Sequence, residues 1–278
     1  MNKTIVITGI STGIGAGLAE HFLKTGYHVV GTVRKESDAD YLKSHERFSY
    51  VVMDVTDRSA TSKLVETIQR SLGNEPLYAL INNAGIAIAG PMECLPDEEF
   101  EKVIDVNVLA VRRITNALLP LMAEGSRIVN ISSVSGLFSS PFTGAYCISK
   151  HALESMTDVY RRELQPFGIK VSAIEPGPIK TPIWSKSKGT LDRFFGTRYG
   201  AMLKNADKII ENAERSGLSV EEVLKSVQAA LESEDPATRY LIHPKKFLFK
   251  VVSKWLPDKW ADSLVAKTMK GGKKHRAV

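Results

Sequence analysis

The chain has 278 residues, of which 43% are hydrophobic and 24% are charged, as is ordinary for a folded globular protein. It has no apolar run of the length that crosses a bilayer, and its first residues follow a strand pattern rather than that of a signal peptide. Two cysteines, Cys94 and Cys147, give neither metal-ligand spacing nor a disulfide framework. We therefore expect a reduced, cytoplasmic protein without a metal site.

The net charge of +6 is concentrated at one end of the chain. Residues 243–278 contain ten Lys or Arg and two Asp, which gives them a charge of +8 and leaves −2 for residues 1–242. The basicity is therefore local. No nucleic-acid recognition motif accompanies it, so we predict no nucleic-acid partner.

The first predicted strand, residues 3–8, continues directly into T-G-I-S-T-G-I-G at residues 8–15. Glycines in such a turn let a phosphate approach the backbone, and the helix pattern that follows offers free N–H groups and a positive dipole end. A single glycine-rich turn is weak evidence, but its place at the first strand–helix turn strengthens it. We predict that this turn binds the pyrophosphate of a dinucleotide.

The end of the second predicted strand, residues 28–33, indicates which dinucleotide binds. An NAD-selective site usually places Asp or Glu there, to bind the adenosine ribose hydroxyls. This chain has Val33, followed by Arg34 and Lys35. A guanidinium binds a 2′-phosphate bidentately, so we predict that NADP(H) is preferred over NAD(H). The alternative is that Arg34 is only a solvated loop charge.

The rest of the first 180 residues alternates between strand and helix patterns. Strands are predicted at 48–53, 77–81, 127–132 and 170–174, and helices at 57–72, 97–122 and 143–165, with Asp57 as the cap of the first of these. Such alternation predicts an α/β, Rossmann-type, doubly wound and mostly parallel sheet with helices on both faces. Residues 239–242 are a candidate seventh strand. Ligands bind beyond the carboxyl ends of such strands.

A short stretch, residues 130–151, contains three side chains suited to acid–base chemistry. Tyr146 and Lys150 are four residues apart and share one helix face, while Ser133 ends the preceding strand. An ammonium one turn away is expected to lower the pKa of the phenol. About 0.7 Tyr-x-x-x-Lys matches are expected by chance in this composition, so the pair taken alone also fits a solvated helix face.

Together these motifs make residues 3–182 resemble the short-chain dehydrogenase/reductase family, in its single-domain branch. The residues that carry the resemblance are the glycine turn, Asn82-Asn83-Ala84-Gly85, Asn107, Ser133, Tyr146-x-x-x-Lys150 and Pro176-Gly177. The resemblance implies hydride transfer between a nicotinamide and a carbonyl or alcohol carbon. It also implies a homodimer or homotetramer. The part after residue 182 resembles, more weakly, the steroid- and retinol-dehydrogenase-like group.

The resemblance also implies roles for individual residues. Tyr146 would protonate the substrate oxygen, Ser133 would hydrogen-bond it, Lys150 would lower the pKa of Tyr146 and bind the nicotinamide ribose, and Asn107 would support a water relay to Lys150. The residues expected to bind the cofactor, besides Tyr146 and Lys150, are Gly9, Ser11, Thr12, Gly13, Ile14, Gly15, Arg34, Asp54, Val55, Asn83, Ala84, Gly85, Pro176, Gly177, Ile179 and Thr181. Ser133, Tyr146 and Trp184 are expected to contact substrate.

We expect one Rossmann-type domain over residues 1–278, with a core at 1–182, a substrate lid at 183–238 and a basic extension at 239–278. The lid is apolar in its first half, which fits either a cover for a hydrophobic substrate or simple packing onto the core. The tail has two short helical patterns with interleaved lysines and aromatic residues. Packing on the lid or on a partner subunit is favoured for the tail, and peripheral contact with an anionic membrane is the alternative.

The predicted function is therefore an NADP(H)-dependent oxidoreductase that acts on a lipid-like aldehyde, ketone, steroid or retinoid. The alternative from another class is a non-catalytic NADPH-binding regulator or scaffold on the same fold. The presence of Ser133, Tyr146 and Lys150 argues against the alternative, because a sensor needs no acid.

Overall fold

The computed structural model of the protein describes residues 3–181, 183, 189–203 and 217–269. A single sheet of seven parallel strands forms its centre, in the order β3-β2-β1-β4-β5-β6-β7. The strands are β1 (Thr4–Ile7), β2 (His28–Val33), β3 (Phe48–Val52), β4 (Ala79–Asn82), β5 (Arg127–Ile131), β6 (Lys170–Pro176) and β7 (Arg239–Ile242). The predicted fold class is confirmed, including the seventh strand.

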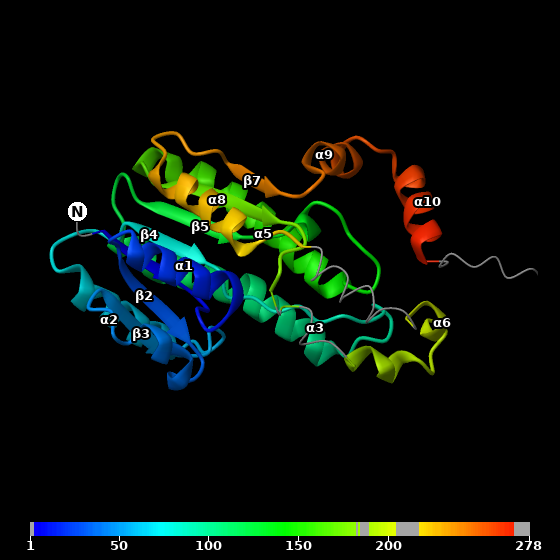
Figure 1. The fold of residues 1–278 in the computed structure, drawn as a ribbon, viewed down its shortest axis with the longest axis horizontal. Coiled ribbons are helices and arrows are strands. Elements are labelled where there is room, and N and C mark those ends of the chain that lie inside the picture. Colours follow the sequence, from blue (N-terminus) through cyan, green and yellow to red (C-terminus); the bar gives the residue numbers. More distant parts are fainter. Residues whose placement is uncertain (1–2, 182, 184–188, 204–216, 270–278) are drawn as a thin grey trace, which may run out of the picture.

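Helices cover both faces of this sheet (Figure 1). Those described are α1 (Gly13–Lys24), α2 (Ala60–Leu72), α3 (Asp97–Ile104), α4 (Ala110–Leu118), α5 (Gly144–Leu164), α6 (Gly200–Leu203), α8 (Val220–Glu232), α9 (Lys246–Lys254) and α10 (Asp258–Met269). Strand order reverses between β1 and β4, since the chain winds outward through β2 and β3 and then returns to β4. A crevice forms at such a reversal, and ligands bind there in open parallel sheets.

Alternating side chains of β1 contact different layers. Ile5 and Ile7 join a core cluster with α1 and α8, whereas Val6 joins a cluster with α2 and α4. This follows from the two-residue period of a strand, which places successive side chains on opposite faces. Because both faces are covered, the strand is apolar along its whole length rather than alternating with polar residues.

Two predicted helices differ in detail from those observed. The helix expected from residue 57 begins at Ala60, because the Asp57 carboxylate accepts hydrogen bonds from the backbone N–H and hydroxyl of Ser59 and forms a turn instead. The long helix expected over 97–122 is continuous but contains one wider, π-helical turn at Asp105–Leu109. Such turns recur at functional sites because they displace one side chain from the regular helix face.

Candidate active site

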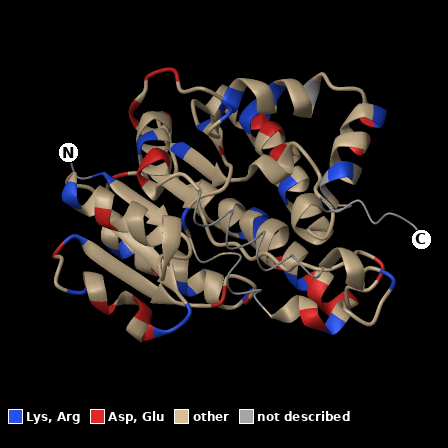
Figure 2. Ribbon diagram, turned by 45° about the vertical axis from the view of Figure 1, so that its right-hand side comes forward, with Lys and Arg blue, Asp and Glu red and all other residues tan. Residues whose placement is uncertain are grey.

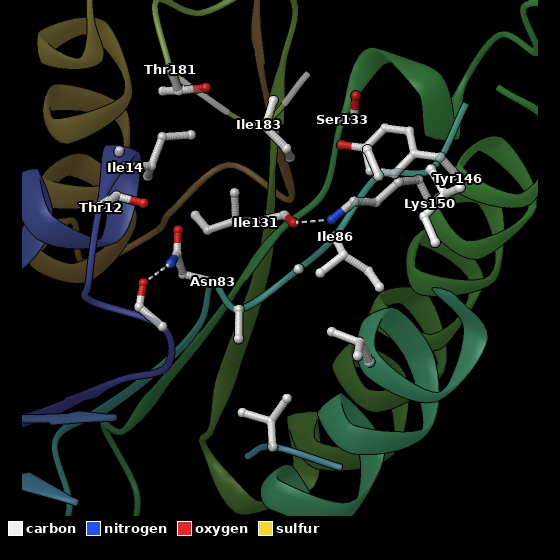
Figure 3. A pocket seen from close by; sticks show the side chains of 18 of the residues that line it. Thr12, Ile14, Asn83, Ile86, Ile131, Ser133, Tyr146, Lys150, Thr181 and Ile183 are labelled. Atoms are coloured by element: carbon white, nitrogen blue, oxygen red, sulfur yellow. Dashed lines mark hydrogen bonds between the residues drawn. The ribbon is translucent and has the colours of Figure 1, made fainter. Parts of the chain in front are cut away.

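A cavity of about 620 Å³ lies at the carboxyl edge of the sheet, where the order of the strands reverses (Figure 3). Segments that follow β1, β2, β3, β4, β5 and β6 all contribute to its wall. This convergence was predicted, since parallel strands bring their carboxyl ends to one edge. The cavity is large enough for a dinucleotide part and a substrate part side by side.

The glycine turn after β1 is held close to the segment after β4. Gly9 has a φ of 72°, and a Cβ built on it would lie 3.0 Å from the Ala84 Cα. A Cβ on Gly15 would lie only 2.2 Å from the Gly9 carbonyl oxygen. These positions require glycine, because a side chain would push the turn away from its neighbours.

The N-terminus of α1 faces the cavity with free donors. Thr12 precedes the helix but makes no side-chain capping bond, and the first turn contains no acidic residue. Ser11, Thr12, Gly13 and Ile14 line the cavity there. Uncapped N–H groups and the positive end of the helix dipole fit a phosphate group. The residues present therefore fit the pyrophosphate of a dinucleotide.

Asn83 fixes this turn to the end of β4. Its side-chain amide donates to the carbonyl oxygens of Thr8 and Gly9, each at 2.9 Å, and its backbone N–H donates to the Thr8 hydroxyl at 3.0 Å. Figure 3 shows the Asn83 side chain pointing at the glycine turn. A polar residue at the end of a buried strand needs such partners. Asn83 thus shapes the cavity as well as lining it.

At the other end of the cavity, Arg34 and Asp54 follow β2 and β3. Arg34 is exposed, lines the cavity, and makes no hydrogen bond or ion pair to any described residue. Asp54 accepts hydrogen bonds from the Thr56 hydroxyl and backbone N–H, which hold the pKa of its carboxyl below the usual value. The charges of Arg34 and Lys102, which both line the cavity, also lower the pKa of the Asp54 carboxyl, so this end of the cavity carries two cations beside one carboxylate.

Ser133 and Tyr146 meet on the opposite wall. β5 ends at Ile131, so Ser133 is delivered to the carboxyl edge, and α5 presents Tyr146 in its first turn. The two side chains lie next to each other in Figure 3, and a hydrogen bond between them acts on the Tyr146 phenol. Ser133 also accepts from the Ser135 N–H at 3.1 Å. Two hydroxyls that converge on one point can bind a single substrate oxygen.

Lys150 lies one turn further along α5 and is buried. Its Nζ donates to the Ile131 carbonyl oxygen at 2.8 Å and lies 5.6 Å from the centre of the Tyr146 ring. Burial lowers the pKa of this ammonium to about 8, and the nearby Glu154 carboxylate opposes that change. The hydrogen bond to Ile131 thus fixes the position of the Lys150 side chain on the cavity wall.

The expected direction of the Tyr146 pKa is wrong for this chain. Burial raises the pKa to about 12, and the hydrogen bond with Ser133 opposes that rise without reversing it. The physical reason is that moving a phenolate out of water costs more free energy than the hydrogen bond with Ser133 provides. Lys150 donates its hydrogen bond to Ile131 rather than to the phenol. Tyr146 is therefore an un-ionised phenol at neutral pH.

Asn107 lies in the π-helical turn and makes a specific set of bonds. Its amide donates to the Ile86 carbonyl oxygen and to the Ser149 hydroxyl, and its oxygen accepts from the Ile86 N–H, all at 2.9 Å. It therefore ties the segment after β4 to α5, next to Lys150. Asn107 does not line the cavity wall.

Behind Lys150, α5 is joined to β7 by a group of charges. The Arg239 guanidinium contacts the Glu154 carboxylate at 3.0 Å, Asp158 at 2.8 Å and Glu175 at 3.3 Å. Glu154 and Glu175 are almost fully buried, so their charges require this partner. The group fixes the helix that carries the two titrating residues of the site.

Most predicted site residues come together on this cavity. Of those named from the sequence, all line it except Gly15 and Asn107, which support it from behind, and Trp184, which lies outside the described residues. The sequence did not reveal Ile86, Ile88, Glu99, Ile183 or Arg193 as lining residues. The three isoleucines give the wall an apolar part.

Arg193 and Glu99 form a two-pronged ion pair beside the cavity. The guanidinium nitrogens contact the two carboxylate oxygens at 2.6 and 2.5 Å, which joins the short helix Thr190–Phe194 to α3. Both residues line the cavity. Sequence alone gives no signal for this pair, because 94 residues separate its members.

The apolar residues of the expected lid pack mainly onto the core. Leu191, Phe194 and Leu203 are buried in a cluster with Ala89, and Tyr199 packs against that cluster. Gly90 leaves room for Phe194, since a Cβ there would lie 2.8 Å from the ring. For these residues the packing interpretation is correct. The side chains of this region that line the cavity are instead Ile183, Thr190 and Arg193.

Comparisons with known proteins agree with this geometry. The family described as short chain dehydrogenase matches residues 3–191. An NADPH-dependent 3-dehydrocapnine reductase from Ornithobacterium rhinotracheale is 39% identical over 95% of this chain and 96% of its own length. Mouse retinol dehydrogenase 16 is 33% identical over 95% of this chain and 88% of its own length.

A solved structure gives the same result for the fold. A short-chain dehydrogenase from Streptomyces avermitilis superposes with a TM-score of 0.78 and 27% identity, covering 97% of this chain and 96% of that one.

Proposed function

This chain belongs to the short-chain dehydrogenase/reductase family and is an oxidoreductase, and we propose that it uses NADPH to reduce the carbonyl group of a hydrophobic substrate. The proposal rests on one observation above the others. Ser133 and Tyr146 lie together on the cavity wall opposite the glycine turn, and Lys150 lines the same cavity beside them. When bound, the nicotinamide supplies the hydride.

The protein supplies orientation and a proton. The hydroxyls of Ser133 and Tyr146 bind the substrate oxygen, and Tyr146 donates its proton as negative charge develops there. Burial raises the pKa of the Tyr146 phenol to about 12, so at neutral pH the side chain carries the proton that reduction requires. Lys150 places a positive charge close to the Tyr146 phenol. Its ammonium would bind the hydroxyls of the nicotinamide ribose. Asn107 keeps the segment after β4 in register with α5.

Tyr146→Phe tests this assignment because it removes only the hydroxyl. We expect carbonyl reduction to fall by about 10²-fold or more, with NADPH affinity changed little. Loss of turnover with intact cofactor binding supports the acid role. Robust turnover by the variant would contradict it. Tight NADPH binding by a wild type that turns over none of the candidate carbonyls would instead favour the non-catalytic regulator.

The preference for NADPH is a second part of the proposal. Arg34 is an exposed cation on the cavity wall, hydrogen-bonded to no described residue, and no carboxylate stands at Val33 to repel a 2′-phosphate. The relative from Ornithobacterium is named as NADPH-dependent, which supports the same preference. Arg34→Ala is expected to raise KM for NADPH about tenfold or more and to leave KM for NADH nearly unchanged.

Arg58→Ala provides the matched control, because Arg58 is also exposed but does not line the cavity. Equal losses with both cofactors in the Arg34 variant would contradict the preference.

The substrate is proposed to be lipid-like. Ile86, Ile88, Val134 and Ile183 give the substrate end of the cavity an apolar wall. The names of the relatives, a 3-dehydrocapnine reductase and a retinol dehydrogenase, make 3-dehydrocapnine and retinaldehyde the first compounds to test. NADPH oxidation should increase with the apolar size of the carbonyl compound. Turnover of small polar carbonyls only would reject this substrate class while leaving the enzyme class intact.

We also propose that the chain forms a homodimer or homotetramer through its long helices. Ile148 and Val159 of α5 are more than 40% exposed, and so is Leu109, just before α4. Paired helices would bury these side chains. Light scattering on the purified protein measures the mass directly. A monomer at micromolar concentration would contradict the proposal.

A further inference from the structure

The two C-terminal helices carry large apolar side chains that nothing in the described chain covers. Phe247 and Trp255 are 81% and 80% exposed, and Trp260 is 68% exposed. Isolated exposed apolar residues are ordinary, but a group of aromatic residues on adjacent helices marks an interaction surface. None of the described residues covers these side chains, and the expected packing on the lid or on a partner subunit stays a prediction.

The large exposed apolar side chains lie on one side of each helix. Phe247 and Val251 of α9 and Trp255, which directly follows that helix, are spaced at intervals of four, and in α10 Trp260 and Leu264 have the same spacing. Both helices are short, and none among the described residues is long and apolar enough to cross a bilayer. The pattern is therefore that of helices that lie on a surface rather than through it.

The charges are arranged to match an anionic surface. Lys246 and Lys250 share the side of α9 that adjoins Phe247, and Lys267 shares the side of α10 that carries Trp260 and Leu264. The two acidic residues of α10, Asp258 and Asp262, fall on the opposite side of that helix. Figure 2 shows lysines on both helices.

We propose that α9 and α10 form a peripheral membrane-binding surface that attaches the protein to bilayers containing anionic phospholipid. Aromatic side chains on such helices insert among the lipid headgroups while lysines bind lipid phosphates. A second copy of the chain fits the surface less well, because its basic tail would meet an equally basic one. The helices lie beyond the carboxyl end of β7, at the edge of the sheet where the cavity forms (Figure 1).

Vesicle co-sedimentation of the full chain tests the proposal, with phosphatidylcholine vesicles that contain or lack phosphatidylglycerol. We expect binding only when phosphatidylglycerol is present, and weaker binding in high salt because the attraction is screened. Two of the three tryptophans lie in the proposed surface, so their emission should shift to shorter wavelength on binding. The assay contains neither substrate nor cofactor, so its result is independent of the proposed function.

Two double variants separate the contribution of the aromatic side chains to vesicle binding from that of the lysines. Phe247→Ser with Trp255→Ser, and Lys246→Glu with Lys250→Glu, are each expected to weaken binding about tenfold or more. Phe167→Ser is the matched control, since Phe167 is 66% exposed but lies outside the tail. Because the substituted side chains are exposed, the variants should keep the wild-type circular dichroism.

Unchanged vesicle binding by both tail variants would overturn the proposal. Absence of binding by the wild type would also overturn it. If the aromatic variant also lowered the mass measured by light scattering, the surface would be assigned to contact between copies.

Discussion

Helix α5, which carries Tyr146 and Lys150, and the C-terminal helices α9 and α10 differ in what their side chains contact. Tyr146, Lys150 and Glu154 of α5 are more than nine-tenths buried although all three are polar, whereas Phe247 and Trp255 are exposed although both are apolar. Buried polar groups require partners inside the protein, and exposed aromatic groups gain from partners outside it. The first region holds its groups in fixed positions, and the second presents them to another surface.

The largest effect is expected from removing the guanidinium that pairs with the buried carboxylates behind α5. Arg239→Met removes the guanidinium that contacts Glu154 and Glu175, which should lower the free energy of unfolding by about 3 kcal/mol. Urea unfolding followed by circular dichroism measures the loss. Arg162→Met is the control, because Arg162 contacts Asp158 at 3.5 Å but is 69% exposed. Equal losses in the two variants would remove the distinction between the buried and exposed regions.

Lys150→Met tests the contrast between the buried and the exposed region, because it replaces a buried charge with an apolar chain of similar length. At pH 7 we expect the free energy of unfolding to rise by about 2 kcal/mol, because burial disfavours the Lys150 ammonium and part of the gain is lost with its bond to Ile131. Activity should be lost at the same time. A variant less stable than the wild type at pH 7 would contradict the prediction.

The pH dependence of that gain has a defined sign. The folded pKa of Lys150, about 8, lies below its ordinary value of 10.5, so the unfolded chain binds more protons between these two pH values. Wild-type stability attributable to Lys150 therefore rises with pH across this window. The advantage of Lys150→Met should be full below about pH 8 and nearly absent by about pH 10.5. Parallel urea titrations at several pH values measure it.

A smaller effect is expected from opening the ion pair beside the cavity. Arg193→Ala and Glu99→Gln should each raise KM for the carbonyl substrate a few-fold, since a partly exposed pair contributes about 0.5–1 kcal/mol. Steady-state kinetics give the value. Arg198→Ala is the control: its partner Glu93 is also an acid, but neither residue lines the cavity. A rise in KM for the control alone would contradict the assignment.

The smallest effect is expected in the tail. Trp255→Ser should change the free energy of unfolding by no more than about 0.5 kcal/mol, because the indole contacts little of the folded chain. Thermal unfolding measured without lipid gives the comparison. A loss of several kcal/mol would show that Trp255 is buried in solution, and the contrast between the two regions would disappear.

The sequence predicted those parts of the site that local patterns define. The glycine turn, Ser133 and the Tyr146–Lys150 spacing each follow from a strand end or a helix period, and the parallel sheet places them on one cavity. Residues that meet only through the fold were missed, as with Arg193 and Glu99. The direction of the Tyr146 pKa was wrong because the extent of burial cannot be read from a four-residue spacing.

The C-terminal tail is a second case in which the sequence predicted the elements but not their contacts. Its two short helices were predicted from the spacing of apolar residues, and α9 and α10 confirm them. The spacing of apolar residues shows which side of a helix is apolar. It does not show whether that side contacts the core or another surface.

The position of Arg239 at the start of β7 has a consequence for synthesis of the chain. A nascent chain released from the ribosome only as far as residue 238 already contains Glu154, Asp158 and Glu175 but lacks the guanidinium that contacts all three. Asp158 keeps its ion pairs with Arg161 and Arg162, but the nearly buried Glu154 and Glu175 lack this guanidinium, which disfavours their burial. Helix α5 is therefore expected to pack stably against the sheet only near the end of translation. A message truncated before codon 239 should yield a chain that chaperones retain.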